Sequence, residues 1–112
     1  MKALSILGTS SSAGKSWMTT AVCAWLRSQG VRVAPFKAQN MSNNGAALFS
    51  GGEIARAQVV QAEACGLLPV PEMNPILLKP SGGIGSQLVL NGEARGHYRA
   101  LDYYRDFDRL WE

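Results

Sequence analysis

The feature that most constrains the fold is a short apolar run that leads directly into a turn of small residues. The run is ALSIL at residues 3–7, and the turn is GTSSSAGKS at residues 8–16. This order is typical of a P-loop, in which backbone N–H groups surround phosphate at the start of a helix. The spacing departs from the usual G-x-x-x-x-G-K-[ST], because five residues separate Gly8 from Gly14 and Thr9 stands at the usual glycine position.

The chemistry of such a turn assigns a role to each of its residues. Successive N–H groups of the loop enclose the phosphates, Lys15 reaches the β- and γ-phosphates, and the Ser16 hydroxyl completes the shell of a Mg²⁺ ion. The alternative is that a serine-rich loop merely caps a helix, but a cap does not explain the Gly-Lys-Ser order. The predicted phosphate-binding residues are Thr9, Ser10, Ser11, Ser12, Ala13, Gly14, Lys15 and Ser16.

Hydrophobic periodicity predicts alternating strands and helices over the rest of the chain. We expect strands at 2–7, 31–36, 74–80 and 87–92, helices at 15–29, 53–65 and 100–111, and a long loop at 38–52. The last of these strands runs into an Asn-Gly turn. This order predicts one α/β domain over residues 1–112, with a mostly parallel sheet flanked by helices as in P-loop NTPases. The sheet is expected to be incomplete at the C-terminus, because no strand follows the last helix.

Polar residues beyond the loop are open to two interpretations each. Lys37 follows the predicted strand 31–36, and ligands of α/β sheets bind at the carboxyl ends of strands, but a lysine there is also an ordinary solvated residue. Glu53 is predicted to begin a helix, where a carboxylate either complements the helix dipole or binds a metal ion. Gln58 and Gln61 interrupt an apolar helix face and therefore either point to solvent or line a site.

Composition narrows the classes of function. With 46% hydrophobic and 17% charged residues, the chain is that of an ordinary globular protein, and its net charge of +3 comes from no basic block. We therefore expect no nucleic-acid partner. The apolar runs are too short for a signal peptide or a membrane span. Cys23 and Cys65 are unclustered and are interpreted as small core residues, so a reduced, cytoplasmic compartment is expected.

Five blocks of the sequence carry a resemblance to a known family. They are GTSSSAGKS, VAPFKAQNMSNN, GGEIARAQVVQAEA, MNPILLKP and GSQLVLNG, in this order and over essentially all 112 residues. Together they resemble the N-terminal synthetase domain of the cobyric acid synthase family, the glutamine-dependent amidotransferases of cobalamin biosynthesis. That domain is similar to dethiobiotin synthetase, whose P-loop has the same spacing between its glycines.

The resemblance implies a ligase reaction and assigns residues to it. Members of the family use ATP and Mg²⁺ to phosphorylate peripheral carboxylates of adenosylcobyrinic acid a,c-diamide, and ammonia from glutamine then displaces the phosphate to give adenosylcobyric acid. By similarity, Lys15 and Lys37 are the expected catalytic residues. Metal binding is expected at Ser16 and Glu53, and contacts with the corrinoid substrate at Gln39 and Asn40.

The departures from the family pattern leave two further hypotheses. Complete members also carry a glutaminase domain with a nucleophilic cysteine and a histidine, which has no counterpart here, so the chain is expected to be an N-terminal fragment supplied with ammonia from elsewhere. It could then be an inactive fragment that at most binds nucleotide. The other alternative is a P-loop switch or partitioning ATPase, but such proteins usually carry a second lysine early in the loop, and residues 9–13 contain none.

Overall fold

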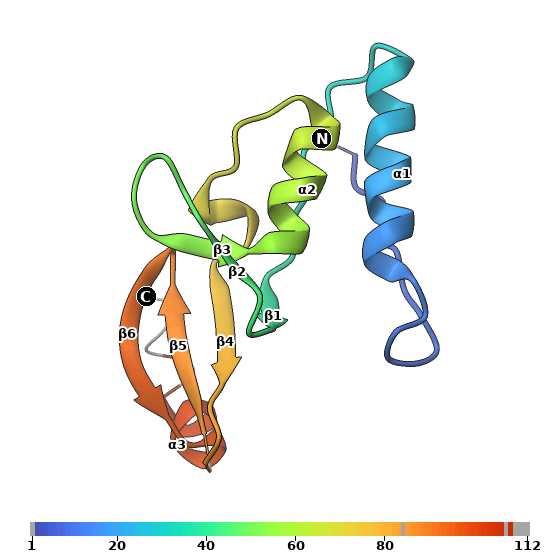
Figure 1. Ribbon diagram of the computed structural model, residues 1–112. Helices are drawn as coiled ribbons and strands as arrows, with labels where there is room; N and C mark the ends of the chain where they lie inside the picture. The colour runs from blue at the N-terminus through green and yellow to red at the C-terminus, as the bar shows by residue number, and fades with distance from the viewer. Residues whose placement is uncertain (1, 84, 107, 109–112) are drawn as a thin grey trace.

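The fold is an α/β arrangement of a four-stranded sheet and a short two-stranded ribbon, in which two helices pack on each other beside the ribbon and a third packs on the sheet. The computed structural model describes residues 2–83, 85–106 and 108. Their elements are α1 (Lys15–Ser28), β1 (Gln39–Met41), β2 (Gly45–Ala47), β3 (Glu53–Ala55), α2 (Arg56–Cys65), a 3-10 turn (Pro71–Met73), β4 (Ile76–Pro80), β5 (Ser86–Leu90), β6 (Glu93–Tyr98) and α3 (Ala100–Arg105). Helix α2 lies between α1 and the strands (Figure 1).

The main sheet has four strands in the order β1-β4-β5-β6. Strands β1 and β4 are parallel and are joined through α2, which makes one βαβ unit. The β4–β5 and β5–β6 pairs are antiparallel, so the expected α/β class is found with a mixed sheet instead of a mostly parallel one. The reversal after β5 follows from the predicted Asn-Gly turn, because Asn91 and Gly92 have φ values of 48° and 84°, as a tight hairpin turn requires.

Strand β4 is buried on both faces and forms the centre of the core. On one face Ile76 and Leu78 pack with Leu88 of β5 and with Tyr103 of α3. On the other face the core consists of Leu77, Val89 and Ala55. Apolar side chains in a strand covered on both sides run without polar interruption, which is why the ILL run of β4 was recognisable in the sequence.

Two of the predicted strands are wrong. Residues 2–7 and 31–36 form no strand, and the side chains of Leu4, Leu7 and Phe36 are 71%, 86% and 70% exposed. A strand exists only when a neighbour takes up its backbone N–H and C=O groups, and an apolar sequence carries no information about that neighbour. The chain instead joins the sheet at β1, which begins at Gln39, beyond the end of the predicted strand 31–36.

The predicted boundaries of the next elements are also wrong. The expected loop 38–52 contains β1 and β2, and the expected helix 53–65 begins only at Arg56. Residues 53–55 are held as a strand by bonds to distant segments, among them the Glu53 N–H to the carbonyl of Gly92. Helix α3 ends at Arg105, and the part of the predicted helix at residues 107 and 109–111 lies outside the described residues.

The contact between α1 and α2 buries both cysteines. Cys23 and Cys65 are 4% and 8% exposed, which confirms that they are small core residues. Burial raises the pKa of the Cys65 thiol to about 12, and a hydrogen bond with Cys23 adds to this effect. In the part of the chain that the structure describes, no helix is both long and apolar enough to cross a membrane.

Asn74 is the buried junction of the fold. Both polar atoms of its side chain make hydrogen bonds. Nδ2 donates to the carbonyls of Lys37 and Ile76 at 3.1 and 3.0 Å, and Oδ1 accepts from the N–H of Ala55 at 3.1 Å. The residue is 1% exposed, so no solvent can replace these bonds. One amide therefore joins the segment before β1, the end of β3 and the start of β4.

Replacing this amide should destabilise the chain strongly. Asn74→Ala leaves buried backbone groups without their partner, and we expect the free energy of unfolding to fall by about 3 kcal/mol. Urea denaturation followed by circular dichroism measures this change, with the exposed Asn43→Ala as a control that should stay within about 0.5 kcal/mol of the parent. A loss for Asn74→Ala as small as that of the control would show that the junction is not needed.

Candidate functional site

The loop before α1 contains two residues in left-handed backbone conformations and leads into an uncapped helix start. Ser12 and Gly14 both have positive φ values, 58° and 88°. Gly14 is the N-cap of α1, and no side-chain hydrogen bond caps this helix in the described structure. The first N–H groups of a helix have no partner within it, and the helix dipole favours negative charge there. The loop is thus not the serine cap considered as the alternative, and its geometry suits a phosphate.

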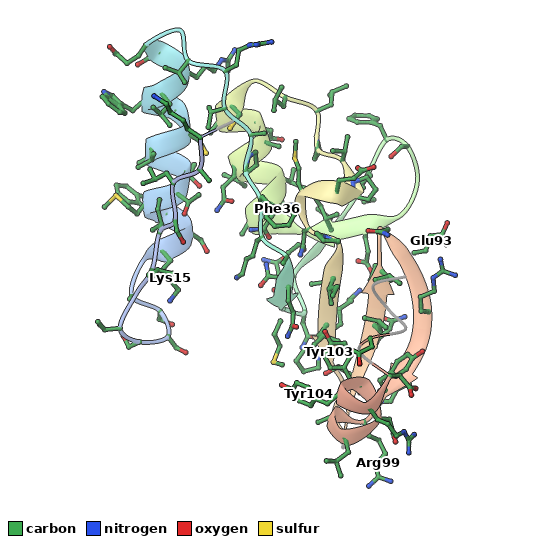
Figure 2. The ribbon with its side chains drawn as sticks, turned by 180° about the vertical axis from the view of Figure 1, so that it is seen from behind. Lys15, Phe36, Glu93, Arg99, Tyr103 and Tyr104 are labelled. Carbon is green, nitrogen blue, oxygen red and sulfur yellow. The ribbon has the colours of Figure 1, made fainter. Side chains whose placement is uncertain are left out.

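Lys15 is folded back over the loop. Its Nζ donates to the carbonyl of Ser10 at 2.9 Å. Its stem lies against Gly8, where a Cβ atom would come within 3.0 Å of both Cγ and Cδ of the lysine. Figure 2 shows Lys15 where the loop meets the helix. A glycine at position 8 is therefore what allows the lysine to lie at the mouth of the loop.

Lys37 lies just before β1 and is anchored at both ends. Its N–H donates to the carbonyl of Met73 at 2.9 Å, and its own carbonyl accepts from Asn74. Its ammonium donates to Oδ1 of Asn40 at 3.1 Å. The side chain is thereby drawn toward α2, where Nδ2 of Asn40 donates to Oε1 of Gln58 at 2.8 Å.

The two glutamines of α2, which the sequence allowed either to face solvent or to line a site, are buried and point inward. Gln58 and Gln61 are 1% and 4% exposed. Nε2 of Gln58 is 3.5 Å from Oε1 of Gln61, and Nε2 of Gln61 donates to the carbonyl of Ser16 at 3.3 Å. We call Asn40, Gln58 and Gln61 the amide chain. It connects the ammonium of Lys37 with the carbonyl of Ser16 in the first turn of α1, one residue after Lys15. The side chain of Lys15 bonds instead to the carbonyl of Ser10.

The other predicted site residues have partners of their own. Gln39 accepts a hydrogen bond from the hydroxyl of Tyr103 at 2.9 Å. The carboxylate of Glu53 bonds with Nζ of Lys79 at 2.9 and 3.1 Å. Glu53 belongs to β3 and Ser16 to α1, and α2 stands between these elements (Figure 1). The structure therefore does not bring Glu53 to the loop.

No metal site is built from protein side chains alone in the described ranges, because no three His, Cys, Asp or Glu residues gather there. This does not conflict with the P-loop interpretation. Mg²⁺ at such loops is held by one hydroxyl, by phosphate oxygens and by water. Ser16 is exposed in the first turn of α1, next to Lys15, as that arrangement requires.

An uncapped helix start after a loop of small residues, a lysine folded over that loop and a sheet beyond the next helix are features of a nucleotide-binding α/β domain of the P-loop type. The comparisons with known proteins agree. Residues 4–111 match the family described as the CobQ/CobB/MinD/ParA nucleotide binding domain, and the chain belongs to this family.

Comparison with curated proteins identifies a narrower group of relatives. The chain is 52% identical over 112 residues to the cobyric acid synthase of Thermosynechococcus vestitus, 53% over 113 residues to that of Acaryochloris marina, and 54% over 112 residues to that of a Synechococcus strain. These alignments include 99%, 100% and 99% of this chain. They include only 23%, 23% and 22% of the length of the three relatives. The resemblance to cobyric acid synthases is thus confirmed. No solved structure matches the chain.

The contact of Lys15 with Gly8 can be tested directly. In Gly8→Ala the new methyl group displaces the lysine stem, and we expect nucleotide affinity to fall about tenfold, because one charge-assisted contact to phosphate is weakened. The fold should be retained, because the group that must move is a flexible side chain. Calorimetric titration measures the affinity. Gly82→Ala is the matched control, since a Cβ atom there meets no atom within 4 Å. Equal affinities of the two variants would show that Lys15 does not need this glycine.

Proposed function

We propose that this chain is the ATP-binding part of an amide-forming ligase that converts adenosylcobyrinic acid a,c-diamide into adenosylcobyric acid. The observation that carries the proposal is the loop before α1, with Lys15 folded over it and with Lys37 joined to the same helix by the amide chain. The curated relatives, which are cobyric acid synthases matched over the whole chain, support the choice of substrate.

The proposed chemistry explains why two lysines are needed. A carboxylate is a poor electrophile, so its oxygen first attacks the γ-phosphorus of ATP, and ADP leaves. Ammonia then attacks the carbonyl carbon of this acyl phosphate, loses a proton, and phosphate departs with the former carboxylate oxygen. The loop N–H groups and Lys15 hold the phosphates, and Lys37 neutralises charge on the group in transfer. The ammonia would come from glutamine through a glutaminase domain outside these residues.

The remaining assignments belong to the same proposal. Ser16 would hold Mg²⁺ together with phosphate oxygens, and this ion would neutralise phosphate charge. Gln39 and Asn40 would face the corrinoid substrate. The amide of Asn40 already has a partner on each of its polar atoms. Gln39 is exposed at the sheet edge and is the more accessible of the two. We also propose that the protein works in the cytoplasm.

Two other functions remain as alternatives to be tested. One is a P-loop switch or partitioning ATPase, since the family description also names MinD and ParA. The curated relatives at over 50% identity are cobyric acid synthases, which favours the ligase. The other is a fragment that has no activity and at most binds nucleotide, and a binding titration addresses it.

Removing the ammonium of Lys15 should weaken nucleotide binding strongly. We expect Lys15→Ala to lose at least about tenfold in affinity for a non-hydrolysable ATP analogue with Mg²⁺, because a direct phosphate contact disappears. Isothermal titration calorimetry measures this, and the exposed Lys2→Ala serves as the control of equal charge change. If the parent and Lys15→Ala give the same heat, the loop is not a nucleotide site and the proposal fails.

The metal role of Glu53 has its own test. The carboxylate is bonded to Lys79 away from the loop, so we expect Glu53→Gln to leave the Mg²⁺ concentration needed for half-maximal nucleotide binding unchanged. A rise of about threefold would show that the carboxylate leaves Lys79 to bind the ion. Glu93→Gln, an exposed carboxylate paired with Arg95, is the matched control. An unchanged Mg²⁺ dependence would remove Glu53 from the metal site and leave it as the partner of Lys79.

A further inference from the structure

We infer that Gln58 and Gln61 are positioning residues for Lys37. Through Asn40 they hold its ammonium at a set place relative to the first turn of α1. The inference rests on the proposed function, because Lys37 matters only if phosphate is bound beside Lys15. It adds that the γ-phosphate contact of Lys37 depends on two buried amides of α2 that touch neither nucleotide nor substrate.

The chemistry of the two ends fixes the direction of the amide chain. An ammonium can only donate, so Oδ1 of Asn40 must accept from Lys37 and its Nδ2 must donate onward. A backbone carbonyl can only accept, so Nε2 of Gln61 must face Ser16 and its Oε1 must face Gln58. Gln58 is then oriented from both sides, with Oε1 toward Asn40 and Nε2 toward Gln61. Reversing any one amide would set donor against donor and acceptor against acceptor.

Burial makes this arrangement stiff. Asn40, Gln58 and Gln61 are 8%, 1% and 4% exposed, so water has little access to replace a broken bond. An amide left unpaired in such surroundings costs about 1–3 kcal/mol, and neighbouring bonds of one direction strengthen each other. The amide chain therefore holds the ammonium of Lys37 at one place. Without these partners an exposed lysine side chain would adopt many rotamers.

The geometry of α2 explains why two glutamines suffice. Positions 58 and 61 lie three residues apart and so on the same face of the helix. That face meets Asn40 of β1 at one end and α1 at the other. Because the backbone of Lys37 is itself bonded to Met73 and Asn74, both its main chain and its ammonium are held.

The main experiment is a double-mutant cycle of Lys37→Met and Gln58→Met in the 112-residue chain. With Mg²⁺, the Kd values of an ATP analogue and of ADP are measured for all four proteins. Each single variant should lose about fivefold in affinity for the ATP analogue and less than about twofold for ADP, since only ATP presents a γ-phosphate. The double variant should be no weaker than either single one. Gln29→Met, an exposed glutamine at the end of α1, should change nothing.

Other outcomes overturn the inference. Additive losses, or equal losses for the ATP analogue and ADP, would mean that Gln58 supports only the fold. A Gln58→Glu variant tests the link to Gln61, because its carboxylate still accepts from Asn40 but cannot donate to Gln61. It should also lose affinity for the ATP analogue, and full affinity in Gln58→Glu would show that the bond to Gln61 does not help to position Lys37.

A second measurement separates this inference from the proposed function and does not need a stable Gln58 variant. In ¹⁵N-labelled chain without nucleotide, Lys37→Met should shift the side-chain NH₂ resonances of Asn40, Gln58 and Gln61 in turn, whereas Lys2→Met should not. If these signals move but Lys37→Met leaves ATP affinity unchanged, the role of Lys37 in the proposed function is wrong and the amide chain stands. If the Gln61 signal does not move, no continuous chain exists.

Discussion

The hydrogen bonds of the Asn74 side chain are the interaction on which the rest of the structure depends. They fix the backbone of Lys37, the N–H of Ala55 and the start of β4 at one point. Ala55 is the N-cap of α2, so the same amide sets where that helix begins and hence where its glutamines lie. A buried polar side chain thus positions a site located on other elements.

The two lysines of the candidate site are held in different ways. Lys15 is bonded to a carbonyl only five residues away, within the loop that precedes it. Lys37 depends on side chains from β1 and α2 and on a backbone group of α1. The first arrangement is local and survives wherever the loop itself is formed. The second exists only when the helices and the sheet are packed together.

This difference explains how much of the molecule could be predicted from its sequence. The loop, α1 and the Asn-Gly turn depend on neighbouring residues and were recognised, with α1 ending one residue before the predicted boundary. The strand expected at 2–7 and the helix start expected at Glu53 depended on distant partners and were wrong. The sequence does not decide whether Gln58 and Gln61 face solvent or line a site, because their sequence neighbours do not show which side of α2 is covered. The role of Asn74 has a single signal in the sequence, a lone amide inside the apolar MNPILL segment.

The exposed apolar side chains have a consequence for the behaviour of the chain in solution. Trp17 and Trp25 on α1 are 76% and 61% exposed, and Leu4 and Leu7 are more than two-thirds exposed in a segment whose backbone forms no ladder. Such a surface favours contact between like molecules, and unpaired backbone groups add a template for intermolecular sheets. The state of association of the chain should therefore depend on protein concentration and on salts that strengthen apolar contacts.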